Sequence, residues 1–141
     1  MRKLKLQIQL SIDGFIAGPN GEMDWMIWNW DDKLKDFVTQ LTESTDTIPY
    51  WRSNKELEGA EKINNSKKIV FTKTLESSNW ENTILEKGDL TDKIQELKSL
   101  TGNDMIAYGG GAFVSSLIKE NLIDEYYFFI NPSILGEGMP I

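Results

Sequence analysis

The chain has 141 residues, of which 40% are hydrophobic and 11% aromatic, and its formal net charge is −7. This length suits one domain over residues 1–141, and the aromatic content excludes a disordered chain. The acidic balance argues against nucleic acid as a partner, because a nucleic-acid binder presents a basic face.

The chain contains no Cys and no His. A disulfide framework and a thiol nucleophile are therefore excluded, and we expect no metal site because the commonest ligand is missing. Proton transfer would have to use Asp, Glu, Lys, Tyr or water. No apolar stretch follows the first charged residues as in a signal peptide, and none approaches the ~18 residues of a membrane span. We therefore expect a cytoplasmic protein that does not contact a membrane.

The first elements in chain order are a strand and a loop. Apolar and polar residues alternate from 4 to 10, which predicts a strand. Residues 11–21 contain four turn-forming residues in their last part, which predicts a loop. Three tryptophans follow within six residues, at Trp25, Trp28 and Trp30.

Helical spacing then predicts a helix over residues 33–43, with Asp31 and Asp32 as its cap. Its buried stripe should consist of Leu34, Phe37, Val38 and Leu41. Residues 45–48 resemble the start of a strand that Pro49 interrupts, and residues 55–65 are polar and helical or irregular.

The second half of the chain alternates strands with helices. Strands are predicted over residues 67–72, 83–85, 104–108 and 123–130, and helices over 91–100 and 112–121. The helical residues expected to face the core are Leu90, Ile94, Leu97, Leu100, Phe113, Leu117 and Ile118. This alternation predicts an α/β domain with a largely parallel sheet and helices on its faces. The aromatic run from Tyr126 to Phe129 fits a central strand buried on both faces, and a dimer surface is the alternative.

The strongest motif is the triple glycine Gly109, Gly110 and Gly111 between a strand and a helix that opens with Ala112. Glycines let the backbone approach a ligand closely, and the free N–H groups of the following helix favour an anion such as a pyrophosphate. The simpler alternative is a tight strand-to-helix turn. The segment is not the G-x-G-x-x-G fingerprint, because Val114 occupies the position of its last glycine.

A second motif, Thr72, Lys73 and Thr74, follows a predicted strand. Ligands of open α/β sheets bind beyond the carboxyl ends of strands, so these residues can hold a phosphate such as the 2′-phosphate of NADPH. A solvated turn is the alternative. The loop from Asp13 to Trp25 can act as a lid with tryptophans that stack on a flat ring, or its tryptophans can simply pack on the core.

These segments together resemble the bacterial dihydrofolate reductase-like family, which includes the reductase domain of riboflavin biosynthesis. The resemblance rests on residues 11–17 (SIDGFIA), 21–25 (GEMDW), 72–74 (TKT), 105–111 (MIAYGGG) with Leu117 and Ile118, and 123–138. It covers nearly the whole chain in the family's order. The resemblance implies a three-layer α/β/α domain with a mixed, mainly parallel central sheet. The opening fits this broader family better than true dihydrofolate reductase.

The resemblance also implies NADPH as the cofactor, bound across the ends of the strands. Ile16 and Ala17 would lie near the nicotinamide, Thr72 to Thr74 near the adenosine phosphate, and Gly109 to Ala112 near the pyrophosphate. The loop with Met23, Asp24 and Trp25 would cover a small heterocyclic substrate, pterin-like or pyrimidine-like, that accepts hydride. The cofactor would supply this chemistry and the protein its orientation.

Two departures from the family concern the extent of the chain. The family usually carries more residues between Ile48 and Pro49, with a Gly-Arg segment that helps bind cofactor phosphate, and Arg52 is not assigned as its replacement. The family also continues beyond the position of Ile141 with final strands. We therefore expect a loop near the 48/49 junction and the C-terminal strands to be missing from these 141 residues.

No catalytic acid is singled out by the sequence. Asp13, Asp31 and Asp32 are the main candidates, with Asp24 as another. For Asp31 and Asp32, helix capping is the favoured alternative. The rival functions are a non-catalytic nucleotide-binding or dimerising protein, with a second copy of the chain as candidate partner, and a flavin-binding protein.

Overall fold

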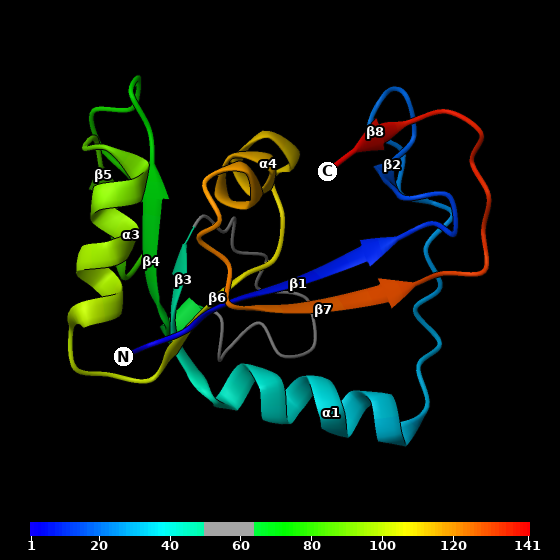
Figure 1. Cartoon of the computed structure of the whole chain (residues 1–141). Helices are drawn as coiled ribbons and strands as arrows, with labels where there is room; N and C mark the ends of the chain where they lie inside the picture. Colours follow the sequence, from blue (N-terminus) through cyan, green and yellow to red (C-terminus); the bar gives the residue numbers. More distant parts are fainter. Residues whose placement is uncertain (50–63) are drawn as a thin grey trace.

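The computed structural model describes residues 1–49 and 64–141 (Figure 1). The polar segment predicted over 55–65 lies outside the described residues except for Asn64 and Asn65, which are helical. Among the described residues, no helix has both the length and the apolar character needed to cross a membrane.

A six-stranded sheet with the order β5-β4-β3-β6-β1-β7 forms the centre of the fold. Every pair of neighbouring strands in this sheet is parallel. The strands are β1 (Leu4–Leu10), β3 (Thr45–Pro49), β4 (Lys67–Phe71), β5 (Thr83–Glu86), β6 (Asp104–Ala107) and β7 (Glu125–Ile130). The carboxyl ends of these strands therefore meet at one edge, where ligands of such sheets bind.

Helices lie on both faces of the sheet and complete three layers. Helix α1 (Asp32–Glu43) covers one face, where Leu41 packs with Ile48 and Ile106. Helices α3 (Leu90–Ser99) and α4 (Gly111–Lys119) cover the other face. The three-layer fold class inferred from the sequence is thus confirmed.

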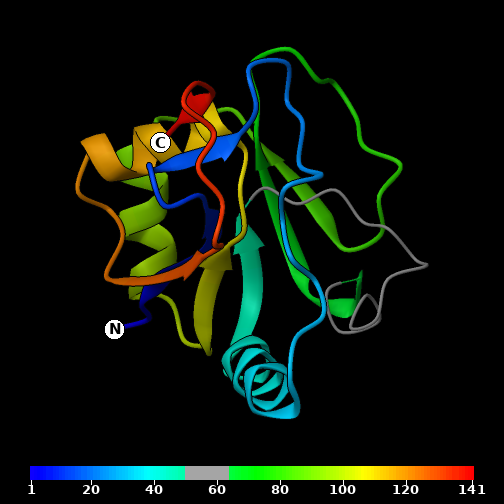
Figure 2. The ribbon, with the colours of Figure 1, turned by 90° about the vertical axis from the view of Figure 1, so that its right-hand side faces the viewer.

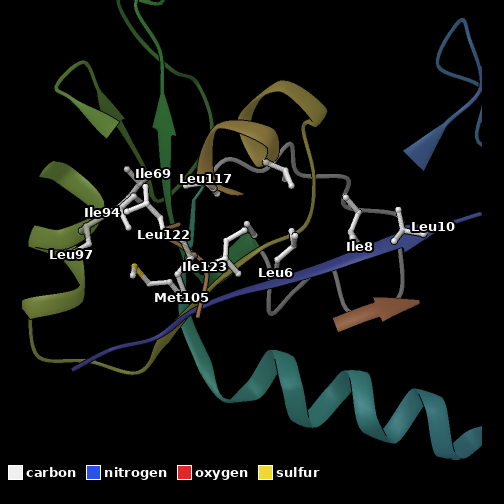
Figure 3. Close-up of a cluster of buried hydrophobic side chains, with 13 residues drawn as sticks. Leu6, Ile8, Leu10, Ile69, Ile94, Leu97, Met105, Leu117, Leu122 and Ile123 are labelled. Carbon is white, nitrogen blue, oxygen red and sulfur yellow. The ribbon is translucent and has the colours of Figure 1, made fainter. Parts of the chain in front are cut away.

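The main core lies between the sheet and helices α3 and α4 (Figure 3). Alternate residues of β1 point into it because side chains on a strand alternate between its two faces. Its members include Leu4, Leu6, Ile8, Leu10, Ile69, Ile94, Leu97, Met105, Val114 and Leu117. The strand and helix positions expected there are confirmed for Ile94, Leu97 and Leu117, while Leu100 is exposed beyond the end of α3.

One strand of a small second sheet lies within residues 11–21, which the sequence predicts as a loop. Strand β2 (Phe15–Ala17) pairs antiparallel with β8 (Met139–Pro140). Both views of the ribbon show this pair beside α4, on the side of the molecule opposite α1 (Figures 1 and 2). The loop prediction is wrong here because strands of three and two residues leave no periodicity to read.

One prediction about packing is wrong and another is confirmed only in part. The run from Tyr126 to Phe129 belongs to β7, which is an edge strand rather than a central one. An aromatic run fits a half-buried strand equally well, so composition alone does not place it in the sheet.

The stripe expected on α1 is only partly covered, since Leu41 is buried and Leu34 and Val38 are half-buried, whereas Phe37 is 43% exposed. Only the C-terminal turn of this helix packs on the centre of the sheet, and Phe37 instead packs on Tyr127 of the edge strand. Strand β3 runs through Pro49, which does not interrupt it but occupies its last position.

Candidate functional site

The triple glycine connects β6 to α4 at the carboxyl edge of the sheet. Gly109 and Gly110 have φ values of 155° and 82°, a region that other residues adopt only with strain. Gly110 is the N-cap of α4, and no side chain caps this N-terminus. A Cβ built on Gly109 would meet no atom within 4 Å. Open space beside glycine backbone and an uncapped helix start together fit a dinucleotide pyrophosphate.

Strand β2 brings a second expected cofactor segment to the same place. A Cβ built on Gly111 would lie 3.0 Å from Cδ1 of Ile16, so this side chain rests directly against the start of α4. Ile16 also packs on the main core, and Ala17 is buried. Residues that are separated by about ninety positions in the chain thus form one continuous surface.

The third expected segment joins this surface through an aromatic contact. The rings of Phe71, the last residue of β4, and Phe113 in the first turn of α4 stack with centroids 5.5 Å apart. Thr72 follows directly, and its Oγ1 accepts hydrogen bonds from the backbone N–H groups of Thr74 (3.2 Å) and Leu75 (3.1 Å). These bonds fix the turn that carries the exposed Lys73. The structure therefore brings all three expected cofactor segments together.

Asp13 serves as an anchor for the C-terminal segment. Its carboxylate accepts hydrogen bonds from the Ser11 hydroxyl (2.7 Å) and from the backbone N–H groups of Gly136 (2.8 Å) and Leu135 (3.2 Å). These donors, the Ser11 hydroxyl foremost, lower the pKa of Asp13 below its ordinary value. A carboxylate held in its charged form by several donors is suited to positioning the turn rather than to giving up a proton.

Asp31 and Asp32 lie at the exposed start of α1. Asp31 is the N-cap, and its Oδ1 accepts a hydrogen bond from the backbone N–H of Leu34 at 2.8 Å. Asp32 is the first helical residue, where a negative charge is favoured by the helix dipole. Asp31 thus fills the capping role that the sequence offered as the alternative to catalysis, and Asp32 contributes a negative charge to the first turn.

The loop with Met23, Asp24 and Trp25 lies beside the chain that follows β7. The Ser133 hydroxyl donates to the backbone oxygen of Trp25 (3.2 Å), and the side-chain oxygen of Asn131 accepts from the N–H of Ile27 (2.8 Å). Met23 and Asp24 are exposed, and Trp25 is half-buried. The loop is therefore held at two points beyond the carboxyl edge of the sheet.

A polar group that the sequence analysis missed lies on the α1 face of β1. Gln7 is 8% exposed, and its Oε1 is a buried acceptor that has no hydrogen-bond partner among residues 1–49 and 64–141. Tyr108, the residue before Gly109, contacts the Thr42 hydroxyl through its own at 3.1 Å, and burial raises the pKa of this tyrosine. The alternation of Gln7 and Gln9 with leucine and isoleucine was the available signal, but it predicted only a strand.

Comparison with known proteins identifies the family of this chain. The model of the RibD C-terminal domain matches residues 2–141. The chain belongs to this family. It is 32% identical to the uncharacterized protein YyaP and 29% identical to YwjB, both of Bacillus subtilis (strain 168), and it covers 80% and 82% of their lengths. In each case 99% of the present chain is aligned.

Solved structures show the same architecture. A putative riboflavin biosynthesis protein from Shewanella sp. PV-4 superposes with a TM-score of 0.70 at 26% identity, over 99% of this chain and 82% of that one. The diaminohydroxyphosphoribosylaminopyrimidine deaminase/5-amino-6-(5-phosphoribosylamino)uracil reductase of Thermotoga maritima (TM-score 0.67, 16% identity) and the dihydrofolate reductase of Schistosoma mansoni (0.57, 14%) share the fold. The chain covers 47% and 80% of those two proteins. Together the family model and these structures support a reductase-type family for this chain.

Proposed function

We propose that this protein is an NADPH-dependent reductase that transfers hydride to a small heterocycle of pterin-like or pyrimidine-like type. The observation that carries the proposal is the convergence of three segments at the carboxyl edge of the sheet. Ile16 touches Gly111, and Phe113 stacks on Phe71 immediately before Thr72. Membership in a reductase-type family supports the same conclusion.

The residues present fit a phosphorylated dinucleotide. The backbone of Gly109 to Ala112 would hold the pyrophosphate, because the start of α4 is uncapped and offers N–H donors to an anion. Ile16 and Ala17 would lie along the nicotinamide, and Lys73 with Thr72 and Thr74 would bind the 2′-phosphate. The cofactor supplies the hydride when bound, while the protein orients the two reactants and limits the access of water.

A dimerising protein without catalytic activity is the second candidate. The observation in its favour is that β7 is an edge strand with exposed aromatic side chains, Tyr126 and Phe128. Edge strands of this kind are sites of association between chains. This candidate predicts a dimer that binds neither nicotinamide cofactor.

A titration of the purified protein with NADPH and with NADH separates these two candidates. Tryptophan quenching and energy transfer to the nicotinamide report binding, and the expected result is micromolar affinity for NADPH that is clearly tighter than for NADH. Lys73→Ala should weaken NADPH binding by about 10- to 150-fold, the value of one charge-assisted hydrogen bond, and leave NADH binding unchanged. Lys67→Ala is the matched control, because Lys67 is an exposed lysine at the start of β4, the strand whose other end leads into Lys73. Absence of binding by either cofactor would overturn the proposal.

A further inference from the structure

The amide of Gln7, whose Oε1 has no hydrogen-bond partner among the described residues, lies level with the residue that precedes the glycine segment. In the pairing of β1 with β6, Lys5 is opposite Ile106 and Leu6 is opposite Ala107, so Gln7 is level with Tyr108. On its other side, Gln7 is paired with Tyr127 of β7. The amide is therefore flanked by two tyrosines and lies one residue short of the level of Gly109.

The surroundings of Gln7 are aromatic on the side of α1. The ring of Phe37 lies 5.9 Å from that of Tyr127, and both Tyr108 and Tyr127 pack against the small core under α1. Phe37 remains partly exposed, so the helix does not seal this part of the sheet. Sites for small flat ligands have this composition, with mainly aromatic walls and few placed polar groups.

The next glutamine on the same face of β1 behaves differently. Gln9 Oε1 accepts a hydrogen bond from Nδ2 of Asn131 at 2.7 Å, which ties β1 to the end of β7. Gln7 Oε1 has no such partner in the part of the chain that the structure describes, although nearly all buried polar groups in folded proteins have one. A buried acceptor that is kept without a partner destabilises the fold, and such costs are typical of positions that serve a ligand.

We infer that Gln7 is a substrate-binding residue whose amide oxygen accepts a hydrogen bond from a ring N–H of the heterocycle, which lies between α1 and the sheet beside Tyr108. This inference rests on the proposed function, because the heterocycle that Gln7 would bind is the hydride acceptor of the proposed reductase. It narrows the substrate to heterocycles that carry an N–H donor. It also assigns recognition of that donor to a side chain of β1 rather than to an aspartate of α1.

The test measures lumazine binding by calorimetry, with and without NADPH, for the native protein, Gln7→Met and Gln9→Met. Lumazine carries two ring N–H groups, and 1,3-dimethyllumazine carries none. The native protein should prefer lumazine to the dimethyl compound by about 3- to 10-fold, the value of one neutral hydrogen bond, and Gln7→Met should abolish that preference. Thermal unfolding of Gln7→Met should occur at the same or a higher temperature than in the native protein, whereas Gln9→Met should lower it.

Each outcome bears on one of the two proposals. A native protein that binds both compounds equally, or binds neither, contradicts the inference, as does a preference that Gln7→Met retains. A Gln7→Met protein that unfolds at a lower temperature and keeps its ligand preference identifies Gln7 as a structural residue. Failure to bind NADPH together with a Gln7-dependent preference for lumazine would overturn the proposed reductase while supporting the ligand contact.

Discussion

The substitution Gly138→Ala tests whether β2 holds the cofactor surface in place. A Cβ built at Gly138 would lie 2.4 Å from the backbone oxygen of Ala17 and 3.1 Å from the ring of Phe15. Contact with a backbone oxygen cannot be relieved by rotating a side chain, so β8 and β2 must separate. Overpacking of this kind costs about 2 kcal/mol, which corresponds to a fall in Tm of about 8 °C for a chain of this size.

The same substitution should weaken cofactor binding, because Ala17 and its neighbour Ile16 belong to the proposed cofactor surface. We expect NADPH affinity to fall about tenfold, or about 1.4 kcal/mol, if β2 moves away from Gly111. Tm is measured by circular dichroism and affinity by tryptophan quenching.

Gly136→Ala is the matched control two residues away. Gly136 has a φ of 76°, and a Cβ there would meet no atom within 4 Å. This change should cost about 1 kcal/mol through backbone strain alone and leave NADPH affinity unchanged. Equal effects of Gly136→Ala and Gly138→Ala on NADPH affinity would refute the role given to β2.

Further substitutions at four residues test individual contacts. Asp31→Ala should lower the free energy of unfolding by about 1 kcal/mol in urea denaturation, and Asp31→Ser should restore it; an unchanged value would contradict the capping role. Arg2→Met should lower the free energy of unfolding by about 2 kcal/mol, because the Arg2 side chain is only 7% exposed and pairs with Asp46. The loss is limited because the Asp46 carboxylate is partly exposed and can be hydrated once its partner is removed. Lys3→Met, at an exposed ion pair, should change the free energy little. The pKa of Asp13 is lower in the folded protein than in the unfolded chain, so the charged carboxylate stabilises the fold at any pH above its unfolded pKa. This stabilisation is lost as pH falls from about 5 through the folded pKa. Asp13→Asn should therefore make the Tm less dependent on pH in this acid range, as measured by thermal unfolding.

The sequence predicts well the elements that have a clear period and a cap. Helix α3 begins after an aspartate whose side chain accepts hydrogen bonds from two backbone N–H groups. The alternation along β1 marks the four apolar residues that belong to the main core, although Lys5 and Gln7 between them are buried as well. The pair of β2 and β8 is not predictable in this way, because each strand is very short and its partner is more than a hundred residues distant. The position of β7 at the sheet edge also depends on strand order, which local pattern does not contain.

The candidate site also has features that local sequence predicts and features that depend on contacts between distant residues. The glycine segment and the threonine turn are recognisable because their residue types carry the chemistry of anion binding. Their proximity depends on the contact between Phe71 and Phe113, two residues that the sequence offers only as ordinary apolar positions. Gln7 has no signature beyond a polar side chain in an alternating strand, and its buried, unpartnered state is visible only once β1 is placed between β6 and β7.

Hydrogen–deuterium exchange in the presence and absence of NADPH tests most directly whether the three segments form one cofactor surface. The account predicts that saturating NADPH slows exchange together in the peptides covering residues 15–17, 72–75 and 109–113, with little change in β5 or α3. Protection confined to one of these segments, or located elsewhere in the chain, would contradict it.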